Sequence, residues 1–250
     1  MVRAFIPNFF TFCNLLCGCI ATILAVQNHL VFATIFVGIG IFFDFFDGFF
    51  ARLLGVEGEI GKQLDSMADL ITSGLVPGIV MVQLLAESLG GNREVFQYVW
   101  EDRPSFYFGL PLLSLAGLLI TLASAYRLVK FNLDTRQTSD FIGLPTPANA
   151  ILILSLPLIQ AYQSIPRLSD FIFNPWVLIG LTIFCSFMLN MEFKMFSLKF
   201  KSYSFKENWF RYTFLIFTLI MIVLLQFIAL PLVILIYILF SAILDYVTVE

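Results

Sequence analysis

Charged side chains, histidine and cysteine are all scarce in this sequence. Lysine, arginine, aspartate and glutamate together make up 12% of the 250 residues, against roughly 25% in an average soluble domain. This scarcity excludes a soluble globular protein. With 14 basic residues against 17 acidic ones, we also expect no nucleic-acid partner. The single histidine, His29, falls between two apolar runs, which indicates a turn residue rather than a metal ligand.

The four cysteines form a poor set for disulfide bonds. Cys13, Cys17 and Cys19 lie within the first apolar run, and Cys185 lies in a later one. Thiols inside apolar segments usually act as small hydrophobic side chains. No serine, cysteine or histidine stands beside a candidate base, so a covalent enzyme intermediate is not indicated.

Long apolar runs, in contrast, cover almost the whole chain. Hydrophobic residues make up 60% of it, and runs of about 20 residues, long enough to span a bilayer, recur from end to end. The fold class we predict is all-α, a polytopic transmembrane helical bundle, with Pro231 as the turn between its last two helices. The expected spans lie at about residues 5–27, 30–54, 62–87, 106–130, 147–165, 175–193, 209–228 and 231–248.

The basic residues are distributed unevenly between the two sides of this bundle. With eight spans and both termini on one side, eleven of the 14 basic residues fall on the side of the termini. Basic loops favour the cytoplasmic side of a membrane. We therefore predict an integral, multi-pass protein of the inner (cytoplasmic) membrane, with both termini and the 44–69 region on the cytoplasmic side.

Aspartates interrupt the apolar sequence of the second and third expected spans. They are Asp44, Asp47, Asp65 and Asp69. A carboxylate near the bilayer centre costs roughly 2.5–3.5 kcal/mol, so four unpaired ones would cost roughly 10 kcal/mol or more. A structural ion-pair cluster is one explanation, but only Arg52 and Lys62 are near in sequence. Oxygen ligands alone favour Mg²⁺ or Mn²⁺.

Asp44 and Asp47 belong to one expected helix, and Asp65 and Asp69 belong to the next. Spacings of three and four residues keep each pair on one side of its helix. Two antiparallel helix ends can therefore present four carboxylates to one pocket. Four carboxylates around two divalent cations suit phosphoryl transfer, because the cations neutralise phosphate charge and align the attacking and leaving oxygens. One carboxylate can also accept the proton of an attacking hydroxyl.

Small residues and one arginine share these helix faces. Gly48, Ala51 and Gly61 leave room for a substrate to approach the backbone. Arg52 lies where the acidic face meets the cytoplasm, a position that suits binding of a phosphate.

The spacing of these eight residues resembles the signature of the CDP-alcohol phosphatidyltransferase family. It is Asp44-x2-Asp47-Gly48-x2-Ala51-Arg52-x8-Gly61-x3-Asp65-x3-Asp69. The resemblance implies an enzyme that transfers a phosphatidyl group from a CDP-linked lipid to an alcohol and releases CMP. It also implies a six-helix membrane domain, which we place at 1–205, and a homodimer. Residues 206–250 are expected to form an additional C-terminal transmembrane hairpin.

The same resemblance implies roles for individual residues. The ligands that it implies for two divalent ions, Mg²⁺ or Mn²⁺, are Asp44, Asp47, Asp65 and Asp69. It also implies that Asp69 is the general base. The residues that it implies for binding the CDP group are Asn14, Gly48, Ala51, Arg52 and Gly61.

Further segments resemble the serine-using branch of this family. They are 6–11 with Asn14, 125–132, 141–147 and 196–201. The partners implied are CDP-diacylglycerol, L-serine and membrane lipids. Serine carries a carboxylate and an ammonium group, so we look for cations and polar side chains around residues 125–147. The candidate acceptor-binding residues are Arg127, Lys130, Asn132, Arg136 and Thr146. Anchoring of the cytoplasmic loop is the alternative role for Arg127 and Lys130.

Three other functions stay open from the sequence. The same chemistry with glycerol 3-phosphate or inositol phosphate as acceptor would also need cations. Intramembrane prenyltransferases hold diphosphates with Asp-x2-Asp pairs and Mg²⁺, although Gly48, Ala51, Arg52 and Gly61 argue against that class. A cation transporter would be favoured by aspartates at the membrane midplane, whereas these aspartates cluster near the cytoplasmic helix ends.

Overall fold

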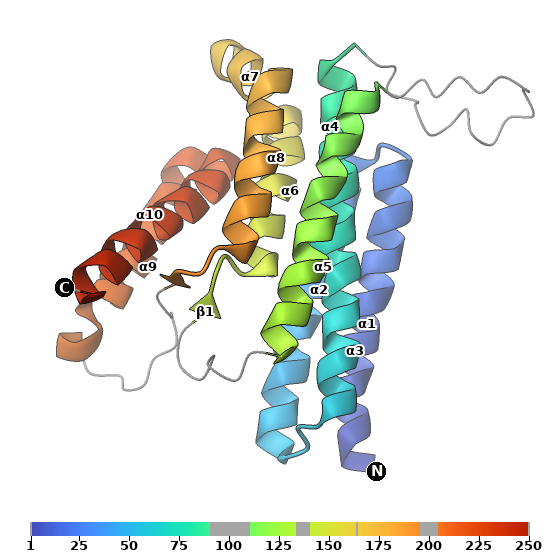
Figure 1. Ribbon diagram of the computed structural model, residues 1–250, viewed down its shortest axis with the longest axis vertical. Helices are drawn as coiled ribbons and strands as arrows, with labels where there is room; N and C mark the ends of the chain where they lie inside the picture. Colours follow the sequence, from blue (N-terminus) through green and yellow to red (C-terminus); the bar gives the residue numbers. More distant parts are fainter. Residues whose placement is uncertain (1, 91–110, 134–140, 164, 196–204, 250) are drawn as a thin grey trace, which may run out of the picture.

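The chain folds into a bundle of long helices, seen in a computed structural model (Figure 1). The structure describes residues 2–90, 111–133, 141–163, 165–195 and 205–249. The α-helices are α1 (Val2–Val26), α2 (Leu30–Leu54), α3 (Glu59–Asp69), α4 (Val76–Ser88), α5 (Leu118–Leu133), α6 (Thr146–Tyr162), α7 (Pro166–Ile172), α8 (Pro175–Asn190), α9 (Phe205–Leu225) and α10 (Ala229–Val249). The shorter elements are the π-helix η1 (Leu70–Leu75), the 3-10 helices η3 (Leu112–Gly117) and η4 (Gln226–Ile228), and the strands β1 (Phe141–Ile142) and β2 (Lys194–Met195).

Several of these helices are long and apolar enough to cross a membrane, which confirms the predicted fold class. Within the described residues there are five such segments, or six if α7 and α8, bent by 57°, form one span. The fifth segment, Arg211–Ile243, contains both α9 and α10, and α6 is a shorter apolar helix. Each of the eight predicted spans thus overlaps a helix. By length and hydropathy alone, however, only five or six segments of the described residues qualify as membrane spans.

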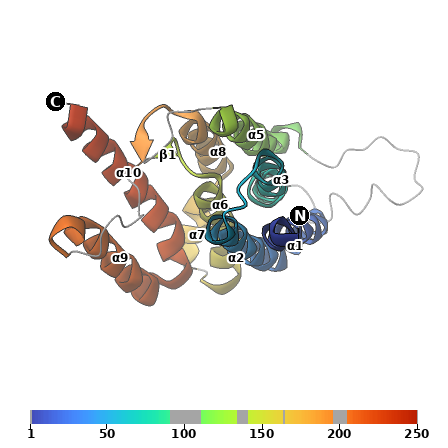
Figure 2. The same cartoon turned by 90° about the horizontal axis from the view of Figure 1, so that it is seen from below.

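Small side chains allow the first helices to pack closely. Ala21 and Ala25 of α1 and Ala33 of α2 are fully buried in one apolar core with residues of α4 and α6. A Cβ added to Gly40 of α2 would lie 2.7 Å from Cγ2 of Thr72. Such close approach of helices is typical of small residues in membrane proteins. It brings α1, α2 and the α3–η1–α4 run together, as the view from below shows (Figure 2).

The third helical run contains a π-helix directly after Asp69. The run is α-helical over Glu59–Asp69, changes to η1 over Leu70–Leu75 and continues as α4. Thr72 within η1 donates its hydroxyl to the carbonyl oxygen of Ala68 at 2.7 Å. Single π turns inside helices often occur at functional sites. Here the wider turn sits at the inner end of the acidic face.

The C-terminal pair forms a hairpin, but its turn is not at Pro231, so that part of the sequence prediction is wrong. The break lies at η4, where Gln226 adopts a positive φ of 50°. Pro231 stands in the first turn of α10, where a missing backbone N–H costs no helical hydrogen bond. The rings of Phe214 and Tyr237 lie 6.0 Å apart between centroids, which places α9 and α10 side by side. The hairpin packs on α6, away from α1 (Figure 2).

A short ladder closes the end of the bundle near the start of α6. β1 and β2 pair antiparallel, with Phe141 opposite Met195. Gly143 follows with a φ of +72°, and its N–H donates to the carbonyl oxygen of Phe193 at 3.1 Å. This ladder holds the chain that leads into Thr146, the first residue of α6.

Replacing Gly143 by alanine is expected to destabilise this end of the bundle. A left-handed backbone costs a residue with a Cβ about 1–2 kcal/mol, and the added Cβ would lie 2.8 Å from the carbonyl oxygen of Leu189. We therefore expect the midpoint of thermal unfolding in detergent to fall. The matched control is Gly180→Ala in α8, where an added Cβ meets nothing within 4 Å. Equal unfolding temperatures for the two variants would contradict the prediction.

Candidate active site

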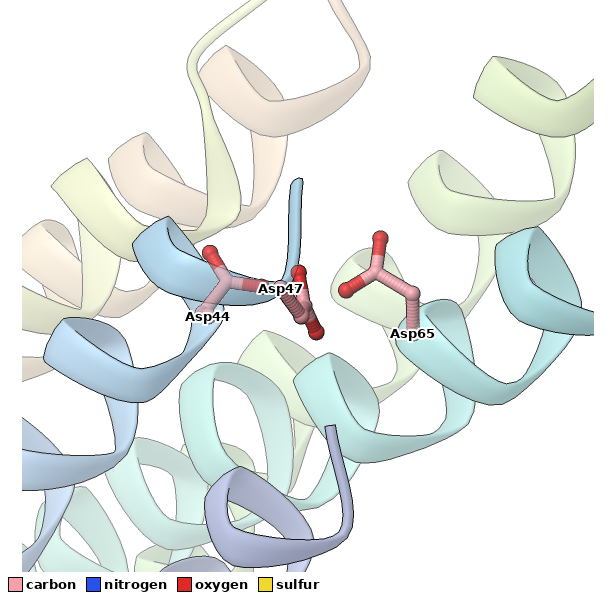
Figure 3. A group of neighbouring side chains, drawn as sticks. All are labelled: Asp44, Asp47 and Asp65. Atoms are coloured by element: carbon pink, nitrogen blue, oxygen red, sulfur yellow. The ribbon is translucent and has the colours of Figure 1, made fainter. Parts of the chain in front are cut away.

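Three of the four predicted aspartates meet at one end of the bundle. Asp44 and Asp47 come from the last part of α2, and Asp65 comes from α3. Each offers a carboxylate oxygen, and these oxygens all lie within 4.8 Å of one another. Figure 3 shows Asp65 pointing across from its helix toward the two aspartates of α2. Gly55, with a φ of +61°, ends α2 and lets the chain turn so that α3 can return beside it.

The surroundings of these carboxylates fit a divalent cation. Among the residues that the structure describes, no lysine or arginine forms an ion pair with Asp44, Asp47 or Asp65. Oδ1 of Asp65 is buried and lacks a hydrogen-bond partner in the described part of the chain. Three carboxylates this close repel one another strongly unless a positive charge lies between them. An all-oxygen ligand set of this kind suits Mg²⁺ or Mn²⁺.

Thr11 of α1 orients one of these carboxylates. Its hydroxyl donates to Oδ2 of Asp47 at 2.7 Å, and both residues are buried, with 2% and 6% exposure. No role was predicted for Thr11 from the sequence. The spacing of Pro7, Thr11 and Asn14 could have indicated one, because it puts all three on the face of α1 that packs on α2 and α3.

Asp69 lies one turn beyond Asp65 and is not part of the three-carboxylate group. Its Oδ1 accepts a hydrogen bond from Nδ2 of Asn14 at 3.4 Å, and Oδ1 of Asn14 in turn accepts one from the hydroxyl of Thr72 at 2.8 Å. Asn14 is fully buried. Asn14 can therefore position the carboxylate of Asp69, and its binding of CDP stays a prediction.

A cavity of about 520 Å³ opens beside the carboxylates. Its walls come from the start of α1, the end of α2 and the start of α3. The lining includes Asp47 and Asp65 and the other four residues predicted to bind CDP, namely Gly48, Ala51, Arg52 and Gly61. A Cβ added to Gly61 would lie 3.7 Å from Oδ1 of Asn8, so a larger side chain there would project into the cavity.

Some of the lining residues were not foreseen from the sequence. Asn8 of α1, Lys62 of α3 and Phe131 of α5 contribute to the wall. Lys62 adds a second cation to that of Arg52, and its Nζ donates to the carbonyl oxygen of Asn132 at 2.9 Å. The cavity thus combines two cations with carboxylates that could hold a metal. This combination suits a phosphate-bearing ligand.

Two of the predicted acceptor-binding residues contact each other. Arg127 of α5 is buried, with 7% exposure, and its Nη1 donates to the hydroxyl of Thr146 at 3.3 Å. Its guanidinium carbon lies 5.9 Å from the centre of the Phe131 ring, and Phe131 itself lines the cavity. Nε of Arg127 is buried and has no hydrogen-bond partner among the described residues.

The other predicted acceptor residues are engaged elsewhere or lie outside the described residues. Lys130 forms an ion pair with Glu192 at 2.6 Å. The side-chain amide of Asn132 donates to the hydroxyl of Ser66 at 2.8 Å, which ties α5 to α3. Arg136 falls in 134–140, outside the described residues. The structure thus brings Arg127 and Thr146 together and turns Lys130 and Asn132 toward protein partners.

Replacing Thr11 by valine is expected to weaken metal binding without unfolding the protein. Loss of a group that orients a metal ligand typically costs 10–100-fold in metal affinity, so we expect about a tenfold rise in the Mn²⁺ concentration at half-maximal stabilisation. The measurement is thermal unfolding of the purified protein during a Mn²⁺ titration. Thr11→Ser keeps the hydroxyl and serves as the control. An unchanged Mn²⁺ midpoint in Thr11→Val would contradict this role.

Comparison with known proteins agrees with this geometry. A sequence model of the CDP-alcohol phosphatidyltransferase family matches residues 4–188. A CDP-diacylglycerol–serine O-phosphatidyltransferase of Bacillus subtilis is 31% identical over 153 residues, which cover 61% of this chain and 75% of that protein. An archaetidylserine synthase of Methanothermobacter thermautotrophicus is 28% identical over 163 residues, 64% of this chain and 60% of that protein.

A CDP-diacylglycerol–serine O-phosphatidyltransferase of Helicobacter pylori is 30% identical over 151 residues, 59% of this chain. The match spans 55% of that relative, so this chain covers less than two thirds of it and of the archaeal relative. The matched region runs from the first turn of α1 through most of α8, and it includes all four aspartates and all lining residues of the cavity. On this evidence the chain belongs to the CDP-alcohol phosphatidyltransferase family.

Proposed function

We propose that this protein transfers the phosphatidyl group of CDP-diacylglycerol to the hydroxyl of L-serine, giving phosphatidylserine and CMP. The observation that carries the proposal is a group of three converging carboxylates, two of which, Asp47 and Asp65, line a cavity that is also lined by Arg52 and Lys62. The names of the relatives from Bacillus and Helicobacter support serine as the acceptor.

The donor fits the cavity by charge and by shape. Its diphosphate is anionic and matches the cations Arg52 and Lys62, and the small residues Gly48, Ala51 and Gly61 leave space for the nucleotide against the backbone. The exposed apolar surface of α1 and α2, such as Phe9 and Phe45, suits the acyl chains of the donor and neighbouring membrane lipids. The cavity therefore accommodates the head of a lipid whose tails stay in the membrane.

The residues that would hold two divalent ions, Mg²⁺ or Mn²⁺, are Asp44, Asp47 and Asp65, with Asp69 beside them. When bound, such ions neutralise the phosphate charge that grows during transfer. Thr11 keeps one oxygen of Asp47 oriented, and Asn14 does the same for Asp69.

The transfer itself is a direct displacement at the lipid-side phosphorus. The serine oxygen forms the new bond to phosphorus, and the bond from phosphorus to the bridging oxygen of the diphosphate breaks. The electron pair of that bond leaves with CMP, and the proton of the serine hydroxyl passes to Asp69. In this proposal Arg127, which donates to the hydroxyl of Thr146, holds the carboxylate of the acceptor.

An acceptor panel tests the choice of alcohol. Purified protein with CDP-diacylglycerol and Mn²⁺ would be given L-serine, glycerol 3-phosphate or inositol phosphate, and the lipid products would be identified by mass spectrometry. We expect phosphatidylserine alone. A product formed only with glycerol 3-phosphate or inositol phosphate would keep the chemistry and overturn serine as the acceptor.

We further propose that the cavity faces the cytoplasm and that the protein works as a homodimer in the inner membrane. The N-terminus lies at the same end of the bundle as the cavity (Figure 1), and the bias of basic residues favours the cytoplasm for that end. Labelling of single introduced cysteines from either side of sealed vesicles tests the orientation, and light scattering in detergent tests the dimer. Labelling of residue 57 only from outside spheroplasts would overturn the orientation.

A further inference from the structure

A second layer of polar residues lies directly beneath Asp69, Arg127 and Thr146. Going inward by one helical turn leads from Asp69 to Ser73, from Arg127 to Ser124 and from Thr146 to Asn149. The direction is the same in all three cases, because α5 runs opposite to α3–η1 and to α6 (Figure 1). Ser73, Ser124 and Asn149 are all fully buried. We name these three residues the inner polar layer.

The contacts between elements support this stacking. Arg127 and Thr146 are joined by a hydrogen bond of 3.3 Å, which sets α5 and α6 at one level. Gly74, the neighbour of Ser73, lies against α5, since an added Cβ would be 3.0 Å from Cβ of Ser124. The π-helix η1 contacts both α5 and α6. Ser73, Ser124 and Asn149 therefore lie around one small region inside the bundle.

None of the three side chains has a hydrogen-bond partner in the described part of the chain. The hydroxyls of Ser73 and Ser124 and both polar atoms of Asn149 are buried without one, as is Nε of Arg127 above them. Burying a polar group without a partner costs roughly 1–3 kcal/mol, so native proteins rarely keep such groups for packing alone. Four of these groups at neighbouring positions indicate a polar occupant. The contrast is Ser155, further along α6, whose buried hydroxyl donates to the carbonyl oxygen of Leu152 at 2.6 Å.

We propose that the inner polar layer is the binding site for the ammonium group of an amino-acid acceptor. This inference rests on the proposed function and extends it to residues outside the signature. An ammonium group carries three donors and no acceptor. The layer offers three neutral acceptor oxygens, from Ser73, Ser124 and Asn149, while Arg127 one turn above offers donors for the carboxylate. An alcohol phosphate such as glycerol 3-phosphate has no cationic group to place there.

The first test is Asn149→Leu, which has nearly the same volume and no polar atom. The loss of a hydrogen bond to a charged group is worth about 1.5–3 kcal/mol, or roughly 10–150-fold in affinity. We expect the KM for L-serine to rise at least about tenfold while the KM for CDP-diacylglycerol stays within twofold. The unfolding temperature is expected to hold or rise, since a buried amide without a partner is removed. A purely structural role for Asn149 would instead lower it.

A comparison of acceptors makes the test specific for the ammonium group. 3-Hydroxypropionate has the hydroxyl and carboxylate of serine but no amino group. The wild-type protein is expected to use it at least about tenfold less well than serine, as judged by kcat/KM, and Asn149→Leu is expected to use the two acceptors nearly alike. Ser155→Ala is the matched control and should keep the wild-type preference. Ser124→Ala, a smaller change, should shift the preference in the same direction.

Binding of radiolabelled L-serine without CDP-diacylglycerol supplies a readout that does not depend on turnover. We expect saturable binding by the wild-type protein and by Ser155→Ala, and at least about tenfold weaker binding by Asn149→Leu. If Asn149→Leu and Ser124→Ala both keep the wild-type KM and acceptor preference, the inference is overturned while the proposed function stands. If the wild-type protein neither binds nor uses serine, the proposed function itself fails.

Discussion

Replacing Asp69 by asparagine is expected to abolish turnover while metal and nucleotide still bind. Asp69 lies outside the group of three carboxylates that could share a metal, and it is held by Asn14 one turn beyond Asp65. Removal of a general base typically lowers the rate by 10²–10⁴-fold, so we expect kcat to fall by at least about 10²-fold. The measurement is CMP release under saturating serine and CDP-diacylglycerol, with Mn²⁺ binding followed by thermal unfolding.

Two comparisons make this result interpretable. Asp170→Asn changes an exposed residue of α7, at the opposite end of the bundle from the N-terminus (Figure 1), and should keep full activity. Asn14→Ala removes the group that positions Asp69 and should lower kcat by about tenfold with little change in KM. Activity of Asp69→Asn close to that of Asp170→Asn would show that another group accepts the proton.

Replacing Asp65 by asparagine is expected to remove the response to metal and, with it, activity. Asp65 is the member of the three-carboxylate group that comes from α3, and its buried Oδ1 has no partner in the described part of the chain. A cation that binds only the folded state, at a free concentration of a hundred times its Kd, stabilises a protein by about 2.7 kcal/mol. We therefore expect Mn²⁺ to raise the unfolding temperature of the wild-type protein and to have little effect on Asp65→Asn.

The effect of Asp65→Asn on the unfolding temperature should change sign when metal is removed. In EDTA the three carboxylates repel one another, so replacing one of them with a neutral amide relieves that repulsion. We expect Asp65→Asn to unfold at a higher temperature than the wild-type protein in EDTA and at a lower one in Mn²⁺. The same order of unfolding temperatures in both conditions would argue against a metal site at these aspartates.

Much of the fold followed from simple features of the sequence. Apolar runs of about 20 residues fixed the helical bundle, because only helices and closed barrels satisfy the backbone in lipid. The break between the last two helices was misplaced. Pro231 is a strong helix breaker in isolation, but it sits in the first turn of α10, while the chain reverses at Gln226–Ile228. Gln163, which directly follows α6, hydrogen-bonds to Leu225 and Ile228 at this turn, and local propensity does not reveal such long-range contacts.

The aspartates were the most predictable part of the site. Spacings of three and four residues placed each pair on one helix face, and the turn at Gly55 brings three of the four within reach of one another. The residues that hydrogen-bond to these aspartates were harder to predict from the sequence. The hydrogen bond from Thr11 to Asp47 joins residues 36 positions apart, and such partners depend on how the helices pack.

The surroundings of the predicted acceptor-binding residues were the hardest to foresee. Charge near the pocket selected both Arg127 and Lys130, but Lys130 pairs with Glu192, which follows α8 in the sequence. The inner polar layer was invisible in the sequence, because a buried serine without a partner and one bonded to its own helix look the same there. The structure separates the two cases, because Ser155 donates to the carbonyl oxygen of Leu152 while the hydroxyl of Ser124 has no partner in the described part of the chain.

The most direct test of the central claim is CMP release from CDP-diacylglycerol by the purified protein, with and without L-serine and with and without Mn²⁺ or Mg²⁺. The account predicts release only when serine and metal are both present, with one phosphatidylserine formed for each CMP. No release with serine, glycerol 3-phosphate or inositol phosphate, at any metal concentration, would contradict it.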